Sequence, residues 1–450
     1  MKKGFVWGVA SASYQVEGAA FEDGRGRSVW DDFAERPGKV YSGHTGEVAC
    51  DQYHRYEEDV AILKRLGIPA YRMSISWSRL LPDGEGAVNQ RGIDFYNRLF
   101  DSLLANGITP YITLYHWDLP SALFHQGGWM NEKCVDWFRN YARLVVESFS
   151  DRVTHYMTFN EPQCFIGMGM GSGEHAPGLT HGARDTLLMA HNVMKAHGAA
   201  VLAMREAAKQ PIQIGYAPTG TMAYPHDPNS QADIQAAKDY LFRNPDPEAW
   251  YWNVPWWSDP VFLGHYPEEG LRLYHPYLPK ITQADLDLIH QPLDFMGENI
   301  YNGHEVRMGD QGPEYVERYP GFPRTANYWP ITPECLYWGP KFLCERYQLP
   351  LYITENGLCC ADAIALDGQV HDPERIDFLA RYLGALKRAV NDGVQVAGYF
   401  QWSLSDNFEW AKGYNDRFGL VFVDYRDQRR IIKDSGYWYS KLIAENGASL

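Results

Sequence analysis

The stretch Val153-Thr154-His155-Tyr156-Met157-Thr158-Phe159, which runs directly into Asn160-Glu161-Pro162, sets the fold class of this chain. Apolar, aromatic and β-branched residues fill the run, as they do in a buried strand, and a carboxylate follows it. The same pattern returns at Leu351-Tyr352-Ile353-Thr354, which runs into Glu355-Asn356-Gly357. The chain therefore contains two predicted strands that each end in a carboxylate.

Six more runs of this kind extend the pattern over the whole chain. The eight predicted strands cover 5–10, 70–75, 110–115, 153–159, 212–217, 295–301, 351–354 and 396–402. Helical stripes lie between most of them, within 53–66, 99–104, 135–149 and 378–390, and Gly67, Gly107 and Gly393 follow three of the stripes. Alternating strands and helices predict α/β structure, with residues 1–450 forming a single (β/α)8 TIM barrel. The alternative is a doubly wound open sheet. Two long segments, roughly 220–290 and 302–345, are expected to be long βα loops around the mouth of the barrel.

The amino-acid composition limits which binding partners and which cellular compartment we expect for this protein. The 450 residues carry a net charge of −15 and contain no basic run, which disfavours nucleic acid and anionic membrane surfaces as partners. Seven cysteines show neither disulfide-framework nor zinc-ligand spacing, so we expect free thiols, a cytoplasmic location, and no metal or cofactor. The apolar stretch after Lys2-Lys3 is too short for a convincing signal peptide.

Polar and aromatic side chains gather at the predicted strand ends, where the catalytic residues of such barrels lie. Seven of the eight strands end in or near them. They are Gln15, Arg72, His116, Asn160, Glu161, Asn299, Tyr301, Glu355, Trp402, Glu409 and Trp410. Amides, a histidine and tryptophans together predict a cavity that bonds hydroxyl groups and stacks on a sugar face. Two carboxylates in such a cavity suit glycosidic bond cleavage, because one can protonate the leaving oxygen while the other meets the oxocarbenium ion.

Several longer motifs occur in order along nearly the whole chain. They are Phe5-Val6-Trp7-Gly8, Ser13-Tyr14-Gln15-Val16-Glu17-Gly18, Tyr71-Arg72-Met73-Ser74-Ile75-Ser76-Trp77, His116-Trp117-Asp118-Leu119-Pro120, Thr158-Phe159-Asn160-Glu161-Pro162, Ile353-Thr354-Glu355-Asn356-Gly357, Asp406-Asn407-Phe408-Glu409-Trp410 and Phe422-Val423-Asp424-Tyr425. In this joint order the chain resembles glycoside hydrolase family 1, the β-glucosidase group. This chain departs from the family pattern at two positions. It has Glu298 where the family commonly has an apolar residue, and Ile300 where the family usually has tyrosine.

The resemblance implies a retaining exo-β-glucosidase that acts on terminal β-D-glucosyl residues of cello-oligosaccharides and of aryl or alkyl glucosides. Glu161 would be the general acid/base and Glu355 the nucleophile that forms a glycosyl-enzyme, with Arg72 and Tyr301 in contact with Glu355. The implied sugar-binding residues are Gln15, His116, Asn160, Asn299, Tyr301, Glu409, Trp410, Trp402 as a stacking floor and Trp329 at the outer site. Cys164 receives no functional role.

Two other functions stay open from the sequence. A 6-phospho-β-glucosidase would need a cation near the sugar O6, and Glu409 occupies the matching region with a carboxylate instead. A carbohydrate-binding pseudoenzyme would need neither Glu161 nor Glu355.

Overall fold

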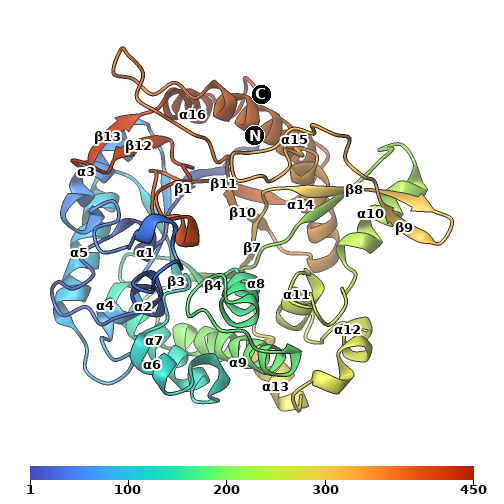
Figure 1. Ribbon diagram of the computed structural model, residues 1–450, viewed down its shortest axis with the longest axis horizontal. Helices are drawn as coiled ribbons and strands as arrows, with labels where there is room; N and C mark the ends of the chain where they lie inside the picture. Colours follow the sequence, from blue (N-terminus) through green and yellow to red (C-terminus); the bar gives the residue numbers. More distant parts are fainter.

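Eight parallel strands close into a barrel at the centre of the molecule (Figure 1). The computed structural model describes residues 1–450. The strands, in their order around the barrel, are β1 (Val6–Ala10), β11 (Val396–Trp402), β10 (Leu351–Asn356), β7 (Phe295–Asn299), β5 (Gln213–Ala217), β4 (His155–Asn160), β3 (Thr109–Tyr115) and β2 (Ala70–Ser74). All eight predicted strands are confirmed, with bounds that differ by at most two residues. The open-sheet alternative is wrong, because β1 pairs with both β2 and β11.

Helices surround this barrel and bury their apolar stripes against it. The longer ones are α3 (Gln52–Arg65), α5 (Gln90–Ala105), α7 (Cys134–Phe149), α9 (Ala183–Ala207), α14 (Cys335–Tyr347), α15 (Pro373–Asn391) and α16 (Asp434–Ala444). The shorter ones include α1 (Ser13–Val16), α2 (Val29–Ala34), α4 (Trp77–Leu80), α6 (Ser121–His125), α8 (Pro162–Ile166), α11 (Pro255–Phe262), α12 (Glu268–Leu273) and α13 (Gln283–Ile289). None of these helices is both long enough and apolar enough to cross a bilayer.

Two hydrophobic clusters pack the two faces of the barrel strands. A cluster of 105 buried residues fills the layer between strands and helices. A second cluster of 12 fills the barrel interior, with Tyr111, Phe295 and Tyr352 near the starts of their strands. Burying apolar surface in both layers drives folding and holds the strand tips rigidly. The strand ends that carry the polar residues lie at the other end of the barrel from these three rings.

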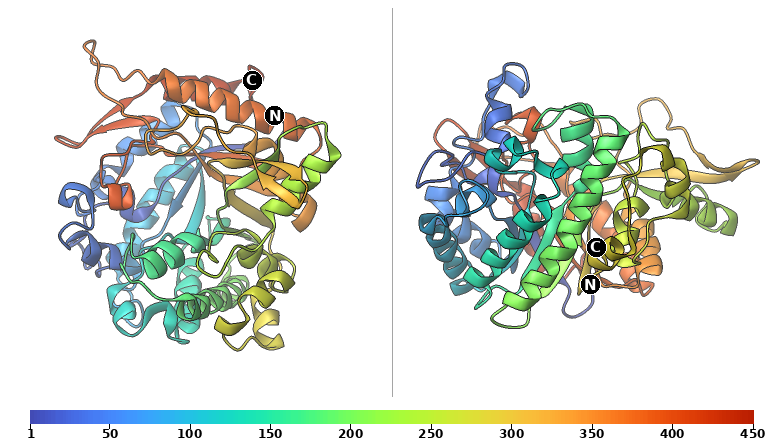
Figure 2. Two further views of the ribbon diagram at one scale, coloured as in Figure 1. Left: turned by 45° about the vertical axis from the view of Figure 1, so that its right-hand side comes forward. Right: turned by 90° about the horizontal axis from the view of Figure 1, so that it is seen from below.

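The two long segments contain more regular structure than the predicted loops. β6 (Met222–Pro225), β8 (Gly303–Gly309) and β9 (Gly312–Tyr315) form a three-stranded sheet, which extends outward beside α10 (Gln231–Leu241) (Figure 2). The segment 302–345 also includes most of α14, which belongs to the ring of helices. The prediction of long βα loops did not include this sheet, because β6 and β9 have only four residues each and show no alternation over that length.

The two ends of the chain meet on one side of the barrel (Figure 1). The Met1 amino group donates a hydrogen bond to the Asn446 carbonyl at 2.7 Å. Beside this contact the first strand pairs with the last one, from Val6 opposite Gly398 to Ala10 opposite Trp402. A hairpin of β12 (Val421–Asp424) and β13 (Arg429–Ile432) precedes the final helix. The β1–β11 pairing is thus the seam that closes the barrel.

Candidate active site

A cavity of about 620 Å³ opens at the carboxyl ends of the barrel strands. Nine of the residues predicted from the sequence line it: His116, Asn160, Glu161, Tyr301, Trp329, Glu355, Trp402, Glu409 and Trp410. Three others, Gln15, Arg72 and Asn299, do not line the cavity. They lie fully buried just behind it and bond to side chains that do.

Two donors hold the Glu355 carboxylate at the end of β10. Arg72 donates to Oε1 at 2.5 Å, and the Tyr301 hydroxyl donates to Oε2 at 2.7 Å. Arg72 is fully buried and also donates to Asn160 Oδ1 at 2.6 Å. A buried guanidinium needs such a charged partner, so the Arg72–Glu355 pair keeps an ionic group in place inside the barrel. One lone pair on each oxygen remains free to face the cavity.

Glu161 is held in a different way at the end of β4. It follows directly after the strand and precedes α8 in a left-handed conformation with φ of 44°, which is strained for a residue with a side chain. Asn299 donates to its Oε1 at 2.7 Å. The Cys164 thiol lies one helical turn further along and donates to its Oε2 at 3.1 Å. No cation forms an ion pair with this carboxyl.

These surroundings separate the two carboxyls chemically. Burial, and then the charge of Glu355, raise the pKa of Glu161 to about 7. Hydrogen bonds from Asn299 and Cys164 act in the opposite direction but are smaller effects. A carboxyl with this pKa keeps its proton at slightly acid pH and can also give it up there. Glu355, by contrast, is paired with a guanidinium. The arrangement can therefore supply a proton donor and an anionic nucleophile together.

His116 presents a neutral imidazole to the cavity. Burial, and then the charge of Arg72, lower its pKa well below the usual value. Asn160 Nδ2 lies 3.1 Å from His116 Nε2, so Nε2 accepts this hydrogen bond and Nδ1 carries the proton. His116 Nδ1 has no partner in the protein. It is thus a free donor for a ligand hydroxyl.

Glu409 lies across the cavity in the loop after β11. Gln15 approaches its Oε2 at 3.4 Å and is held by the Phe408 carbonyl at 2.9 Å. Burial, and then the charge of Asp416, raise the pKa of Glu409 well above its usual range. The sequence predicts a negative charge here, whereas burial works against that charge. In its protonated form the Glu409 carboxyl can both donate and accept hydrogen bonds.

Aromatic rings form a floor and an outer wall. Trp402 is only 3 % exposed and belongs to the floor, whereas Trp329 is 38 % exposed and belongs to the rim. Sequence reasoning missed Trp117, which stacks on Trp410 with ring centroids 4.5 Å apart and donates to the Asn160 carbonyl at 3.0 Å. Its position in the motif His116-Trp117-Asp118 could have indicated that Trp117 belongs to the site. Trp117 and Trp410 have φ of 77° and 51°, so strained backbone concentrates at this cavity.

Glu298 is a second carboxyl that the strands bury, but outside the cavity lining. It is fully buried on β7 beside Asn299, and neither of its oxygens has a hydrogen-bond partner in the protein. Glu298 therefore forms no ion pair behind the pocket. Burial, and then the charge of Glu161, raise the pKa of Glu298 well above its usual range. A buried carboxyl without partners lowers the stability of the fold.

We expect Glu298→Met to stabilise the protein, and more so at high pH. The folded pKa lies above the unfolded one, so the wild-type fold loses stability as pH rises above the unfolded value near 4.5. Removing two unpartnered oxygens should add about 1–3 kcal/mol at pH 8, which is roughly 1–3 °C in the unfolding midpoint for this length. Calorimetry at pH 5 and pH 8 measures the difference. A lower midpoint, or an equal gain at both pH values, would contradict this account.

Comparisons with known proteins match this chain to one family over nearly its whole length. A family model described as glycosyl hydrolase family 1 matches residues 1–448. The chain is 46% identical to β-glucosidase A of Thermotoga maritima, covering 99% of this chain and 98% of that protein. It is also 46% identical to a 1,4-β-D-glucan glucohydrolase of Thermotoga neapolitana, covering 99% of each. A solved structure of a Thermotoga maritima β-glucosidase in complex with glucoimidazole superposes with a TM-score of 0.90, at 45% identity and 99% coverage of both chains.

Proposed function

The chain belongs to glycosyl hydrolase family 1 and is a retaining β-glucosidase, and from this premise we propose which residues perform each step and which glycosides it prefers. Glu161 is the general acid/base, and Glu355 is the nucleophile. The observation that carries this assignment is the contrast between their surroundings. Arg72 and Tyr301 stabilise an anion at Glu355, while burial holds a proton on Glu161.

In the first step, a Glu355 oxygen attacks the anomeric carbon while Glu161 gives its proton to the leaving glycosidic oxygen. The carbon–oxygen bond to the aglycone breaks and an ester to Glu355 forms. Glu161 is left as a carboxylate, which Asn299 stabilises through Oε1. Because Glu355 has then lost its charge to the ester, the repulsion that raised the pKa of Glu161 disappears.

In the second step, water enters where the aglycone has left. Glu161 takes a proton from this water, the water oxygen attacks the anomeric carbon, and the bond to Glu355 breaks. Two inversions give net retention of the β configuration. NMR of the first product from an aryl β-glucoside tests this sequence, with β-glucose expected to appear before mutarotation. If α-glucose appeared first, the nucleophilic role of Glu355 would have to be given up.

The deep end of the cavity suits one terminal glucosyl residue. His116 Nδ1 and Glu409 offer hydrogen bonds to its hydroxyls, and Trp402 provides a flat apolar floor. Trp329 at the rim would contact the aglycone. We therefore propose exo-action on terminal, non-reducing β-D-glucosyl residues of cello-oligosaccharides and of aryl or alkyl glucosides. A carbohydrate-binding pseudoenzyme would gain nothing from a Glu161 carboxyl whose pKa is raised to about 7, or from a second carboxyl, Glu355, paired with Arg72.

Unphosphorylated glucosides should react far better than their 6-phosphates. Glu409 provides no cation, and Arg417, one of the two cations near this part of the chain, is already bonded to Asp406 at 2.5 Å. A phosphate there would lose hydration without gaining a buried positive partner. Lys412 lines the cavity but is exposed at the rim. Measuring kcat/KM on a β-glucoside and on its 6-phosphate tests this preference. A higher value for the phosphate would overturn the substrate assignment.

Glu409→Ala should lower glucoside turnover by about tenfold or more, since each hydrogen bond that this carboxyl makes to the sugar contributes roughly 0.5–1.5 kcal/mol, and more where the carboxyl is charged. Glu409→Gln is the matched control, because it keeps both a donor and an acceptor. The loss should be smaller in this variant. Equal kcat/KM for the wild type and Glu409→Ala would remove Glu409 from the sugar site.

The pH profile of kcat/KM should fall on its alkaline side around pH 7. Glu161 must be protonated in the free enzyme, and its pKa is about 7, so activity is lost as pH rises through that value. Initial rates at low substrate concentration between pH 4 and 9 measure this fall, which is the alkaline limb of the pH profile. Glu161→Gln should abolish it. A limb that persists in this variant would belong to another group.

We further propose that residues 1–450 work as one catalytic domain in a reducing compartment such as the cytoplasm. The barrel strands extend from Val6 to Trp402, and the final helix packs beside the first strand through the Tyr439 hydroxyl, which donates to the Gly8 carbonyl at 2.9 Å. All seven cysteines are free thiols. Reducing conditions keep such thiols intact.

A further inference from the structure

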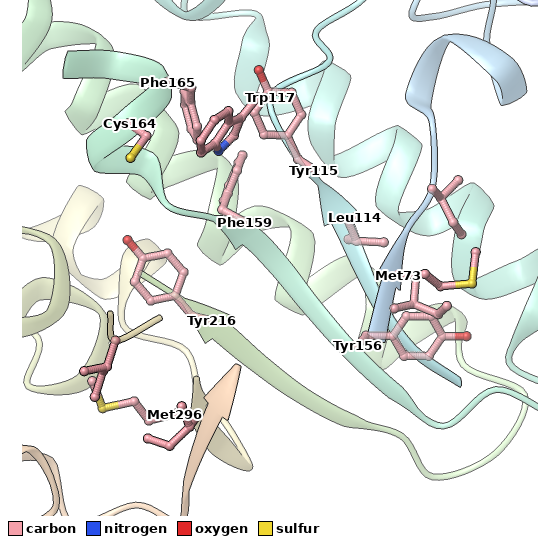
Figure 3. Packing of buried hydrophobic residues seen from close by; sticks show 14 of the residues in the cluster. Met73, Leu114, Tyr115, Trp117, Tyr156, Phe159, Cys164, Phe165, Tyr216 and Met296 are labelled. Atoms are coloured by element: carbon pink, nitrogen blue, oxygen red, sulfur yellow. The ribbon is translucent and has the colours of Figure 1, made fainter. Parts of the chain in front are cut away.

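The contact between Cys164 and Glu161 lies at the reacting centre, yet the mechanism above does not require a thiol. Cys164 is the third residue of α8, and its backbone N–H donates to the Glu161 carbonyl at 2.9 Å. This turn brings the thiol back beside the carboxyl of the residue three positions earlier. Figure 3 shows the sulfur pointing away from the aromatic rings of Phe159 and Phe165. Cys164 lines the cavity while being only 8 % exposed.

The two oxygens of Glu161 therefore have one donor each. Asn299 bonds Oε1, and the Cys164 Sγ lies 3.1 Å from Oε2, which is short for a thiol hydrogen bond. We propose that Cys164 is a positioning residue that orients Oε2 of Glu161 and stabilises the carboxylate that remains after Glu161 has protonated the leaving group. This inference rests on the proposed role of Glu161 as the acid/base.

The chemistry of the thiol fits such a role. Burial, and then the charge of Glu161, raise the pKa of Cys164 well above its usual value. The sulfur thus keeps its proton over the working pH range and always has a donor to offer. Its hydrogen bond strengthens as Glu161 changes from acid to carboxylate, because charged acceptors bind donors more strongly. The thiol therefore favours proton transfer to the leaving oxygen and adds nothing to a reaction that needs no proton.

Cys164→Ala should consequently affect substrates unequally. With an alkyl glucoside or cellobiose, whose leaving groups need a proton, kcat/KM should fall by about threefold to tenfold, as expected for one weak charge-assisted bond. With 2,4-dinitrophenyl β-glucoside it should stay within about twofold, because this leaving group departs as an anion. The alkaline limb of the pH profile should move to higher pH, since a donor that held the pKa of Glu161 down has been removed.

Two further variants separate positioning from packing. Cys164→Ser keeps a donor and should restore both the alkaline limb and the rate on poor leaving groups, whereas Cys164→Val keeps the volume without a donor and should behave like alanine. Cys134→Ala is the control for the loss of a buried thiol. The Cys134 thiol donates to the Trp129 carbonyl at 3.9 Å, does not line the cavity, and should leave the profile unchanged when removed. Unfolding midpoints report whether each variant is folded.

The inference is overturned if folded Cys164→Val keeps the wild-type alkaline limb and loses activity equally on both classes of leaving group. Failure of the assignment on which it rests would be visible separately. If Glu161→Gln retained full activity on alkyl glucosides, the acid/base role of Glu161 itself would be wrong. If Glu161→Gln lost that activity but the Cys164 variants matched the wild type, only the role of Cys164 would be lost.

Discussion

Glu355→Gly should lose hydrolysis by at least about 10⁴-fold, as happens when a nucleophile is removed from an otherwise intact site. The substitution removes the group that Arg72 and Tyr301 hold, and it leaves a space beside the anomeric carbon. Azide is small enough to enter this space, and the freed guanidinium of Arg72 attracts an anion. Azide should therefore restore turnover of an activated aryl glucoside and give α-glucosyl azide, the product of a single inversion.

A matched variant makes this result decisive. Glu355→Gln removes the nucleophile but fills the same space with an amide, so it should be equally inactive and should not respond to azide. NMR of the azide product and initial rates over a range of azide concentrations give both answers. A folded Glu355→Gly variant that azide did not rescue, or that gave β-glucosyl azide, would exclude Glu355 as the nucleophile.

Glu161→Ala should produce the second largest effect, and one that depends on the leaving group. Protonation by a placed acid contributes about 10²–10⁴-fold, so an alkyl glucoside should lose rate by that amount. With 2,4-dinitrophenyl β-glucoside the glycosyl-enzyme should still form rapidly and then accumulate, because no base remains to activate water. A burst of dinitrophenol in stopped-flow measurements would report this accumulation.

Azide distinguishes this variant from the previous one. Here it attacks the glycosyl-enzyme from the side that water uses, so the product should be β-glucosyl azide, with the configuration retained. Equal losses on good and poor leaving groups in the first step would count against Glu161 as the acid. The two variants together thus assign each carboxyl to one face of the sugar.

The barrel strands could be predicted from local sequence because buried parallel strands are continuous apolar runs. Val396–Trp402 shows this most clearly, since its predicted and observed bounds coincide. The outer sheet could not be predicted in the same way. β6 and β8 pair in parallel although some 80 residues separate them along the chain, from Met222 opposite Gly303 onward. No local pattern encodes such a partner, and four-residue strands are too short to show a period.

The motifs predicted which residues gather at this site and that Arg72 and Tyr301 contact Glu355, but they did not predict every contact. Asn299 was expected to bind the sugar, whereas it lies behind the cavity and holds Glu161. Whether a polar side chain touches a ligand or a neighbouring side chain depends on packing across several strands, which residue types alone do not reveal. Cys164 could have been found from its spacing, because a residue three positions after Glu161 at a helix start faces back toward it.

The seam between β1 and β11 has a consequence for biosynthesis. The first strand emerges from the ribosome long before its partner, Val396–Trp402, has been made. Until then the nascent barrel has two unpaired edges, which are templates for pairing with other chains. Glu409, the partner of Gln15 in the sugar site, is made later still. A chain truncated before residue 396 is consequently an aggregation-prone open sheet without a sugar pocket, and it is not a weaker enzyme.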